Sequence, residues 1–207
     1  MTNHTIKAVL LDYGGVIADE GFQNSLRAIS REQGLDERET LQVAKRAVYD
    51  SGFILGSGTQ ETFWQSMREG AGLQGSDNEL TQRVLEGFVL RPWMIEWVKQ
   101  LRAQGYRTVI LSDQSDWLDW LDERDHFFQY FDQVFNSYYL GKGKRDPSLF
   151  HEIAEKLALS PSEILFVDDM QSNVDRAQSA GWNAIRYLDK ASFLEDRDRF
   201  IPTLSQA

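Results

Sequence analysis

The sequence predicts an α/β fold, in which a parallel sheet carries an all-helical segment inserted after its first strand. In residues 1–19 and 91–207, short apolar runs closed by polar residues alternate with helical patterns. Such runs are typical of strands buried on both faces of a parallel sheet. Residues 20–90 contain helical patterns and no convincing strand. We therefore expect a core domain of residues 1–19 and 91–207 and a small helical domain of residues 20–90.

Five segments are expected to form the strands of the sheet. Three are short apolar runs that end at polar residues, and two are shorter candidates. In chain order they cover residues 8–11, 108–111, 133–135, 164–167 and 183–186. Runs of this length favour strands over helices, because a helix needs a longer apolar pattern.

The inserted segment is expected to hold four helices. Their apolar residues recur with helical spacing, and glycine-rich stretches separate them. The patterns cover residues 22–33, 36–49, 59–68 and 77–88. A segment with this many helices and no strand cannot extend the sheet, so we expect it to fold beside the core.

Two core helices have clear end signals. An apolar face over residues 94–101 is followed by Gly105, at the position of a C-terminal cap. A second face covers residues 149–157, and Asp146 and Pro147 precede it as cap and first-turn residues. Helices between strands of this kind support a parallel sheet with crossover connections.

Composition excludes several classes of protein and site. The net charge of -10 argues against a nucleic-acid partner, because phosphate backbones reward clustered Lys and Arg. The lack of cysteine excludes disulfides, thiolate metal sites and cysteine catalysis. No stretch approaches the roughly 20 apolar residues of a membrane span. Asp12 interrupts the apolar run near the N-terminus, so no signal peptide is indicated and we expect a cytoplasmic protein.

Polar residues end three of the predicted strands, namely Asp12, Ser112 and the pair Asp168–Asp169. Ligands of open α/β sheets bind beyond the carboxyl ends of the strands, so these residues are expected at one edge. Lys144 precedes the helix that leads to the last of these strands. A carboxylate can attack phosphorus, a carboxylate pair can hold a divalent cation, and a hydroxyl and an ammonium can bind phosphoryl oxygens. This set predicts phosphoryl transfer.

Four segments resemble the motifs of the haloacid dehalogenase superfamily, and they occur in the family's order. The first carries the Asp-x-Gly-Gly-Val variant of a motif in which a strand ends at the nucleophilic aspartate. The segments are residues 9–17, 110–113, 141–150 and 165–169, the last continued by Asn173, Ala177 and Gly181. The chain therefore looks like a member of subfamily I, the branch with a helical type-one cap.

The resemblance implies a Rossmann-like, three-layer core and identifies residues 20–90 as the cap. It also implies that Asp12 is the nucleophile and that Mg²⁺ is the cofactor. The ion would be held by Asp12, the backbone carbonyl of Gly14 and Asp169, with Asp168 contributing directly or through water.

By the same resemblance, Ser112 and Lys144 would hold the transferred phosphate. Gly15 and Asp113 join them in the expected phosphate-binding set, and Lys144 and Asp113 join Asp12 as expected catalytic residues. The substrate would be a small phosphorylated metabolite, bound by a monomer or a homodimer, with neither nucleic acid nor a membrane as partner.

Two positions depart from the family pattern. Phosphatases of the family usually carry a general acid and base two residues after the nucleophile, where this chain has Gly14. A positioned acid or base contributes roughly 10²–10⁴-fold in rate. Asp113 and Asp19 are candidate replacements. Arg145 occupies a position where the family usually has proline. Its side chain either favours a more anionic substrate or faces solvent.

The leading hypothesis is hydrolysis of a small phosphomonoester, such as a sugar phosphate or a nucleotide, through an aspartyl phosphate. One alternative is a regulatory protein that binds Mg²⁺ and phosphate with weakened catalysis, which Gly14 favours. Another is a metal-independent 2-haloacid dehalogenase, against which the Asp168–Asp169 pair counts. We expect selectivity to reside in residues 20–90 and near Trp117, and bending at Gly14–Gly15 and in residues 87–92.

Overall fold

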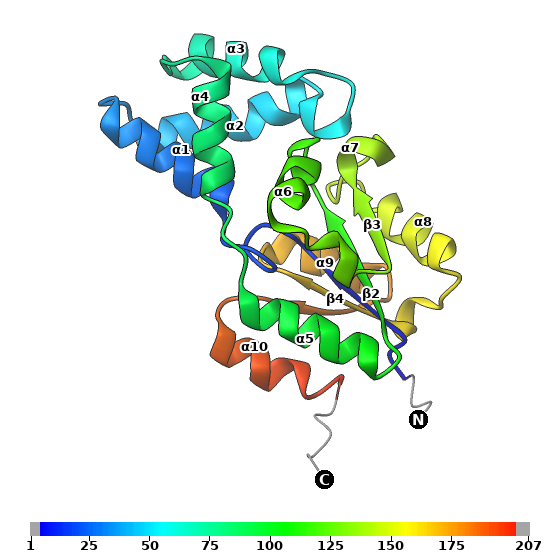
Figure 1. The fold of residues 1–207 in the computed structure, drawn as a ribbon. Helices are drawn as coiled ribbons and strands as arrows, with labels where there is room; N and C mark the ends of the chain where they lie inside the picture. Colours follow the sequence, from blue (N-terminus) through cyan, green and yellow to red (C-terminus); the bar gives the residue numbers. More distant parts are fainter. Residues whose placement is uncertain (1–4, 202–207) are drawn as a thin grey trace.

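The sheet has five parallel strands in the order β3-β2-β1-β4-β5 (Figure 1). This computed structural model describes residues 5–201, so residues 1–4 and 202–207 of the predicted core lie outside the described residues. The strands are β1 (Ala8–Leu11), β2 (Arg107–Ser112), β3 (Gln133–Asn136), β4 (Ile164–Asp168) and β5 (Asn183–Arg186). All five predicted strands are confirmed, with bounds within one residue of those expected.

β1 lies at the centre of the sheet, and this position explains why its sequence is continuously apolar. Its four residues are fully buried. Val9 and Leu11 pack into the apolar cluster on one face of the sheet, and Ala8 and Leu10 pack into the cluster on the other face. Both faces are therefore covered, as expected for a parallel sheet.

Helices cover the two faces and produce a three-layer, Rossmann-like α/β fold. On one face lie α5 (Pro92–Ala103), α6 (Trp117–Asp125) and α10 (Lys190–Arg197), and on the other lie α8 (Ser148–Leu157) and α9 (Gln171–Ser179). In Figure 1, α5 and α10 lie side by side in front of the sheet. Within residues 5–201, every helix is too short or too polar to cross a membrane.

The observed ends of the two core helices lie within about one turn of the ends predicted from the sequence. Gly105 follows α5 with a positive φ of 86° and donates its N–H to the carbonyl of Arg102 at 2.9 Å. α8 begins one residue later than expected, because Pro147 takes the capping position. Asp146 still serves the helix start, since its side chain accepts a hydrogen bond from the N–H of Ser148 at 2.9 Å.

Residues 20–90, here called the helical insert, gather at one end of the molecule (Figure 1). The insert contains α1 (Gly21–Glu32), α2 (Glu37–Asp50), α3 (Gln60–Ala71) and α4 (Asp77–Glu86), with a 3-10 turn η1 (Phe53–Leu55). All four predicted helices are present, with bounds within three residues of those expected. Each begins at a side chain that accepts a backbone hydrogen bond: Glu20, Asp36, Thr59 and Ser76.

Two chain segments join the insert to the core and run side by side. The N–H of Asp19 donates to the carbonyl of Val89, and the N–H of Arg91 donates to the carbonyl of Ile17, each at 2.9 Å. The joint is therefore a pair of hydrogen-bonded segments, linked by an isolated antiparallel bridge between Ala18 and Leu90. The division into two domains at these points stays a prediction.

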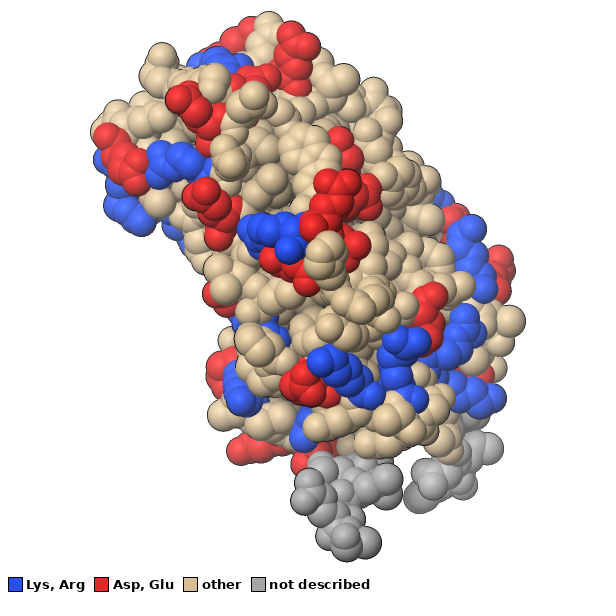
Figure 2. Space-filling view, in the orientation of Figure 1, with Lys and Arg blue, Asp and Glu red and all other residues tan. Residues whose placement is uncertain are grey.

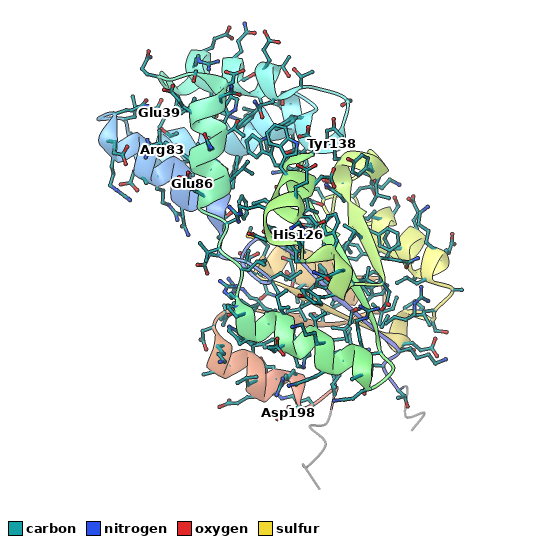
Figure 3. All side chains as sticks on the ribbon, in the orientation of Figure 1. Glu39, Arg83, Glu86, His126, Tyr138 and Asp198 are labelled. Atoms are coloured by element: carbon teal, nitrogen blue, oxygen red, sulfur yellow. The ribbon has the colours of Figure 1, made fainter. Side chains whose placement is uncertain are left out.

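Short elements complete the core, and one of them also contacts the insert. They are η2 (Phe128–Tyr130), α7 (Ser137–Leu140) and η3 (Pro161–Glu163). The Ser137 hydroxyl donates to the carbonyl of Ile54 in η1 at 2.7 Å. Figure 3 shows the neighbouring Tyr138 on the side of the core that meets the insert.

The face drawn in Figure 2 carries acidic and basic side chains interspersed over both the insert and the core. Close pairs of opposite charge occur in both parts of the chain, since Arg83 lies 2.7 Å from Glu32 in the insert and Lys99 lies 2.7 Å from Glu96 in the core. Exposed pairs of this kind contribute little to stability.

Candidate active site

The polar residues that end the strands meet at one edge of the sheet. Asp12 follows β1, Ser112 is the last residue of β2, and Asp168 is the last residue of β4. β1 pairs in parallel with β2 on one side and with β4 on the other. Their carboxyl ends are therefore neighbours, and the expected grouping of these residues is observed.

Asp12 is held from three directions. The Ser112 hydroxyl and the N–H of Tyr13 each donate to Asp12 Oδ1 at 2.7 Å. Lys144 Nζ lies 2.8 Å from Asp12 Oδ2. The Asp12 side chain is only slightly exposed and lines a cavity of about 270 Å³. This carboxylate is thus oriented toward a space that a small ligand can enter.

Lys144 is the buried cation of the site, with 1% of its surface exposed. Its Nζ lies between Asp12 Oδ2 at 2.8 Å and Asp168 Oδ2 at 2.6 Å. Burial alone would lower the pKa of Lys144, but the nearby carboxylates of Asp12, Asp168 and Asp113 outweigh burial and raise it. Lys144 is therefore a fixed positive charge at neutral pH.

Asp168 has no exposed surface, and protein groups occupy both of its oxygens. The Asn173 side-chain amide lies 3.1 Å from each oxygen, and the N–H of Met170 donates to Oδ1 at 2.8 Å. Asp168 is also absent from the walls of the cavity. Asp168 therefore orients Lys144 through their ion pair and does not itself line the cavity.

Three carboxylates crowd together beside the cavity. Asp12, Asp168 and Asp169 each place one oxygen within 4.8 Å of the others. Burial raises the pKa of Asp12 to about 8, with Asp168 and Asp169 adding to the effect and Lys144 opposing it. Burial, and then the charge of Asp168, also raise the pKa of Asp169. A hard divalent cation relieves this repulsion, so the donor set fits Mg²⁺.

The two glycines after Asp12 have different surroundings. Gly14 lines the cavity, and a Cβ added there would lie 3.3 Å from the Phe88 ring. Gly15 has a positive φ of 79°, and its added Cβ would lie 2.6 Å from Asp169 Oδ2. Gly15 is not among the residues that line the cavity. Its observed contribution is the room it leaves for Asp169, and its phosphate-binding role stays a prediction.

The two candidate replacements for the missing acid differ in position. Asp113 lines the cavity, but it accepts hydrogen bonds from the N–H of Lys144 and from the Tyr49 hydroxyl, each at 2.8 Å. Asp19 lies 3.1 Å from Arg91 in an ion pair and does not line the cavity. These contacts favour a positioning role for Asp113 and leave Asp19 without access to a ligand.

Several cavity residues were missed by the sequence analysis. Glu20 and Tyr49 come from the helical insert, and Arg176 comes from α9. The guanidinium of Arg145 stacks on the Tyr49 ring at 3.6 Å and also lines the cavity. No motif or spacing marked the insert residues. Asn173, by contrast, belongs to the fourth motif.

Histidine has no part in the walls of the cavity. Neither His126 nor His151, the two histidines of the described chain, is among the lining residues. His126 follows the last residue of α6, with a positive φ of 53° (Figure 3). The chemistry of the site is therefore that of carboxylates, a hydroxyl and cations.

Comparison with known proteins agrees with this geometry. A family model described as haloacid dehalogenase-like hydrolase matches residues 6–181. The rat bifunctional epoxide hydrolase 2 is 29% identical over 117 residues, which are 53% of the chain. The chain spans only 21% of the length of that relative. A sesquiterpene phosphatase of Aspergillus oryzae is 26% identical over 198 residues, which cover 89% of the chain and 91% of the phosphatase.

A solved structure shares the fold over nearly the whole chain. It is a family enzyme of Bacteroides thetaiotaomicron, with a TM-score of 0.73, 22% identity and coverage of 92% of this chain and 98% of that one. The wild-type enzyme has also been solved in complex with magnesium and inorganic phosphate, and that structure matches with a TM-score of 0.71.

Proposed function

The chain belongs to the haloacid dehalogenase-like hydrolases, and on that basis we propose that it is a magnesium-dependent phosphatase of small phosphomonoesters. One observation carries the proposal: a buried carboxylate, Asp12, faces a cavity while Ser112 and Lys144 hold it in place. A carboxylate oriented in this way is suited to attack phosphorus, because the neighbouring hydroxyl and ammonium can bind the phosphoryl oxygens.

The proposed reaction has two steps. A carboxylate oxygen of Asp12 forms a bond to phosphorus while the bond to the ester oxygen breaks, and the departing alkoxide takes a proton from an acid at the cavity or from water. Water then attacks phosphorus, which frees Asp12 and releases inorganic phosphate. Ser112 and Lys144 bind the phosphoryl oxygens in both steps and offset their charge. Asp168 keeps the ammonium of Lys144 in place through the 2.6 Å ion pair.

Asp12, Asp169 and the backbone carbonyl of Gly14 would hold the magnesium ion. When bound, the ion neutralises negative charge on the phosphate and on the crowded carboxylates. Support comes from the donor set itself and from the Bacteroides enzyme, whose complex contains magnesium and inorganic phosphate. The Aspergillus relative, which the chain matches over most of its length, is a phosphatase by name.

The two rival functions make different demands on the site. A 2-haloacid dehalogenase needs no metal, whereas the crowding of Asp12, Asp168 and Asp169, with one oxygen of each within 4.8 Å of the others, favours a bound cation. A regulatory protein with weakened catalysis would keep the same metal and phosphate contacts and lose turnover through Gly14. The small phosphorylated substrate, the lack of nucleic-acid and membrane partners, the monomeric or dimeric state and the cytoplasmic location stay predictions.

The test is release of phosphate from p-nitrophenyl phosphate and a panel of alkyl and sugar phosphates, with Mg²⁺ or with EDTA. We expect release that requires Mg²⁺ and falls to background in Asp12→Asn. Asp50→Asn is the matched control, because Asp50 is exposed and lies outside the cavity. Release that persists in EDTA would contradict the metal-dependent reaction. Binding of Mg²⁺ and phosphate without any release would support the regulatory alternative.

A further inference from the structure

A smaller cavity of about 140 Å³ adjoins the larger one and points to the kind of alcohol that the enzyme releases. The two cavities share lining residues on the side nearest the carboxylates: Glu20, Gln23, Tyr49, Asp113, Gln114 and Arg145. A phosphate group held beside Asp12 would therefore have a second space within reach of its ester group. The residues around that space decide which leaving groups fit.

The rest of the smaller cavity is walled mainly by hydrocarbon and aromatic rings. The insert supplies Phe22, Val48, Phe53 and Ile54, and α6 supplies Trp117, while Lys45 and Ser115 complete the wall. The ring of Phe53 packs edge-on against Trp117, with 5.3 Å between the ring centroids. Insert and core thus contribute the two sides of one apolar slot.

The polar atoms of the aromatic walls are already engaged within the protein. The Trp117 indole N–H donates to the side chain of Gln60 at 2.8 Å, and the Tyr49 hydroxyl donates to Asp113 at 2.8 Å. A hydroxyl-rich leaving group would lose its hydration against Phe22, Val48 and Phe53 with no hydrogen-bonding group on those side chains to replace it. Such unpaired burial costs free energy, whereas burial of hydrocarbon is favourable.

The volume sets the size of the group. A cavity of about 150 Å³ lined by apolar side chains holds a benzene molecule. The smaller cavity, at about 140 Å³, therefore has room for one six-membered ring or a chain of about six carbons. A nucleoside is too large for this space.

We infer that the smaller cavity binds an apolar leaving group, so that the preferred substrates are phosphomonoesters of apolar alcohols of about six carbons. The inference rests on the proposed phosphatase function and refines its substrate class. It departs from the sugar phosphates and nucleotides expected from the sequence, because the part of the smaller cavity that is not shared with the larger one is lined mainly by apolar side chains.

The experiment compares kcat/KM for n-alkyl phosphates from ethyl to octyl, with benzyl phosphate, glucose 6-phosphate and AMP, all in Mg²⁺. The primary alcohols have similar reactivity as leaving groups, so the chain-length profile reports burial. We expect a rise of about fourfold per methylene until the cavity is full, followed by a plateau. Benzyl phosphate should exceed glucose 6-phosphate by at least about tenfold.

Variants of Val48 locate the effect in this cavity. Val48→Phe narrows the slot and should lower the ratio of hexyl to ethyl phosphate activity by at least about tenfold. Val48→Ser, which removes apolar surface without adding bulk, should lower the same ratio and serves as the second variant if Val48→Phe folds poorly. Leu188→Phe is the matched control, because Leu188 is 62% exposed and lies outside both cavities, and it should keep the wild-type ratio.

The outcomes separate this inference from the proposed function. A flat chain-length profile, or a preference for glucose 6-phosphate, overturns the apolar pocket and leaves the phosphatase intact. A wild-type profile in both Val48 variants also overturns it. Failure to release phosphate from every ester, including p-nitrophenyl phosphate, overturns the phosphatase proposal and the leaving-group pocket with it.

Discussion

Gly14 leaves the departing alcohol without the aspartate that phosphatases of this family usually provide. Asp113 is occupied by hydrogen bonds to Lys144 and Tyr49, and Asp19 pairs with Arg91 outside the cavity. Glu20, which caps α1, lines both cavities at the border between phosphate and leaving group. Burial raises the pKa of Glu20 above its usual value, and one of its oxygens accepts a hydrogen bond from the N–H of Gln23 at 2.8 Å, which leaves the other oxygen for a proton.

Glu20→Gln is therefore expected to slow alkyl phosphates by about 10²-fold and p-nitrophenyl phosphate much less, because p-nitrophenol is a good leaving group that needs little protonation. Glutamine keeps an acceptor for the start of α1. Asp113→Asn is the comparison, and it should slow both substrates to a similar extent because it loosens Lys144. The measurement is kcat for each variant with both substrates. If Asp113→Asn slows alkyl phosphates much more than p-nitrophenyl phosphate while Glu20→Gln slows both equally, the acid is Asp113 and not Glu20.

At the scale of elements, the loop after β1 is shaped to admit Asp169. Its Gly15 adopts a positive φ of 79°, which places the backbone against Asp169 with no room for a Cβ. The Arg91 side chain holds the loop from the other side, by donating hydrogen bonds to the carbonyls of Gly15 and Val16. The loop and the carboxylate therefore fit together as one unit, and a side chain at Gly15 would move a proposed magnesium ligand.

Gly15→Ala should weaken Mg²⁺ binding about 10–100-fold, the range found when groups that orient metal ligands are altered. Isothermal titration of Mg²⁺ into the folded protein measures this directly. Gly34→Ala is the control, because Gly34 also has a positive φ but an added Cβ meets nothing within 4 Å. The Gly34→Ala variant carries the same kind of backbone strain as Gly15→Ala. Equal Mg²⁺ affinity in the two variants would therefore refute the idea that a Cβ at position 15 displaces Asp169.

At the scale of the whole molecule, the helical insert and the core share one apolar cluster. Trp117 of α6 packs against Phe53 at 5.3 Å and Phe63 at 6.1 Å between ring centroids. Both cavities are lined from the insert and the core together, so a ligand touches both parts. We expect the insert to close further over a bound substrate, and the paired joint beside Val89 and Arg91 is where such a motion would bend.

We therefore expect crystals grown with and without vanadate, a phosphate analogue, to differ in the angle between insert and core. The change should be confined to residues 14–15 and 87–92, with the helices of each part unchanged. Tryptophan fluorescence gives an independent measure, because Trp64 of the insert and Trp117 of the core are neighbours, with 6.0 Å between their ring centroids. An identical angle and an unchanged spectrum would weaken the idea of a moving cap.

Local sequence pattern was enough to predict the helices and strands and to group the polar residues at the sheet edge. The apolar runs of β1, β2 and β4 are buried, so these strands could be located from local pattern alone, whereas β3 and β5 are partly exposed and carry a weaker signal. Asp12, Ser112 and Asp168 could be grouped because parallel strands share the same carboxyl edge. The motifs added Lys144 and Asn173, which no periodicity would have selected.

Only the tertiary structure decided what surrounds that edge. Tyr49 and Asp113 are 64 residues apart, and their hydrogen bond follows from how the insert docks. Helical periodicity places Phe22 and Val48 in two successive helices of the insert, but it does not show which of their side chains faces a ligand. That choice depends on the packing of α1, α2 and α6 around the cavities, a long-range property with no spacing rule in the chain.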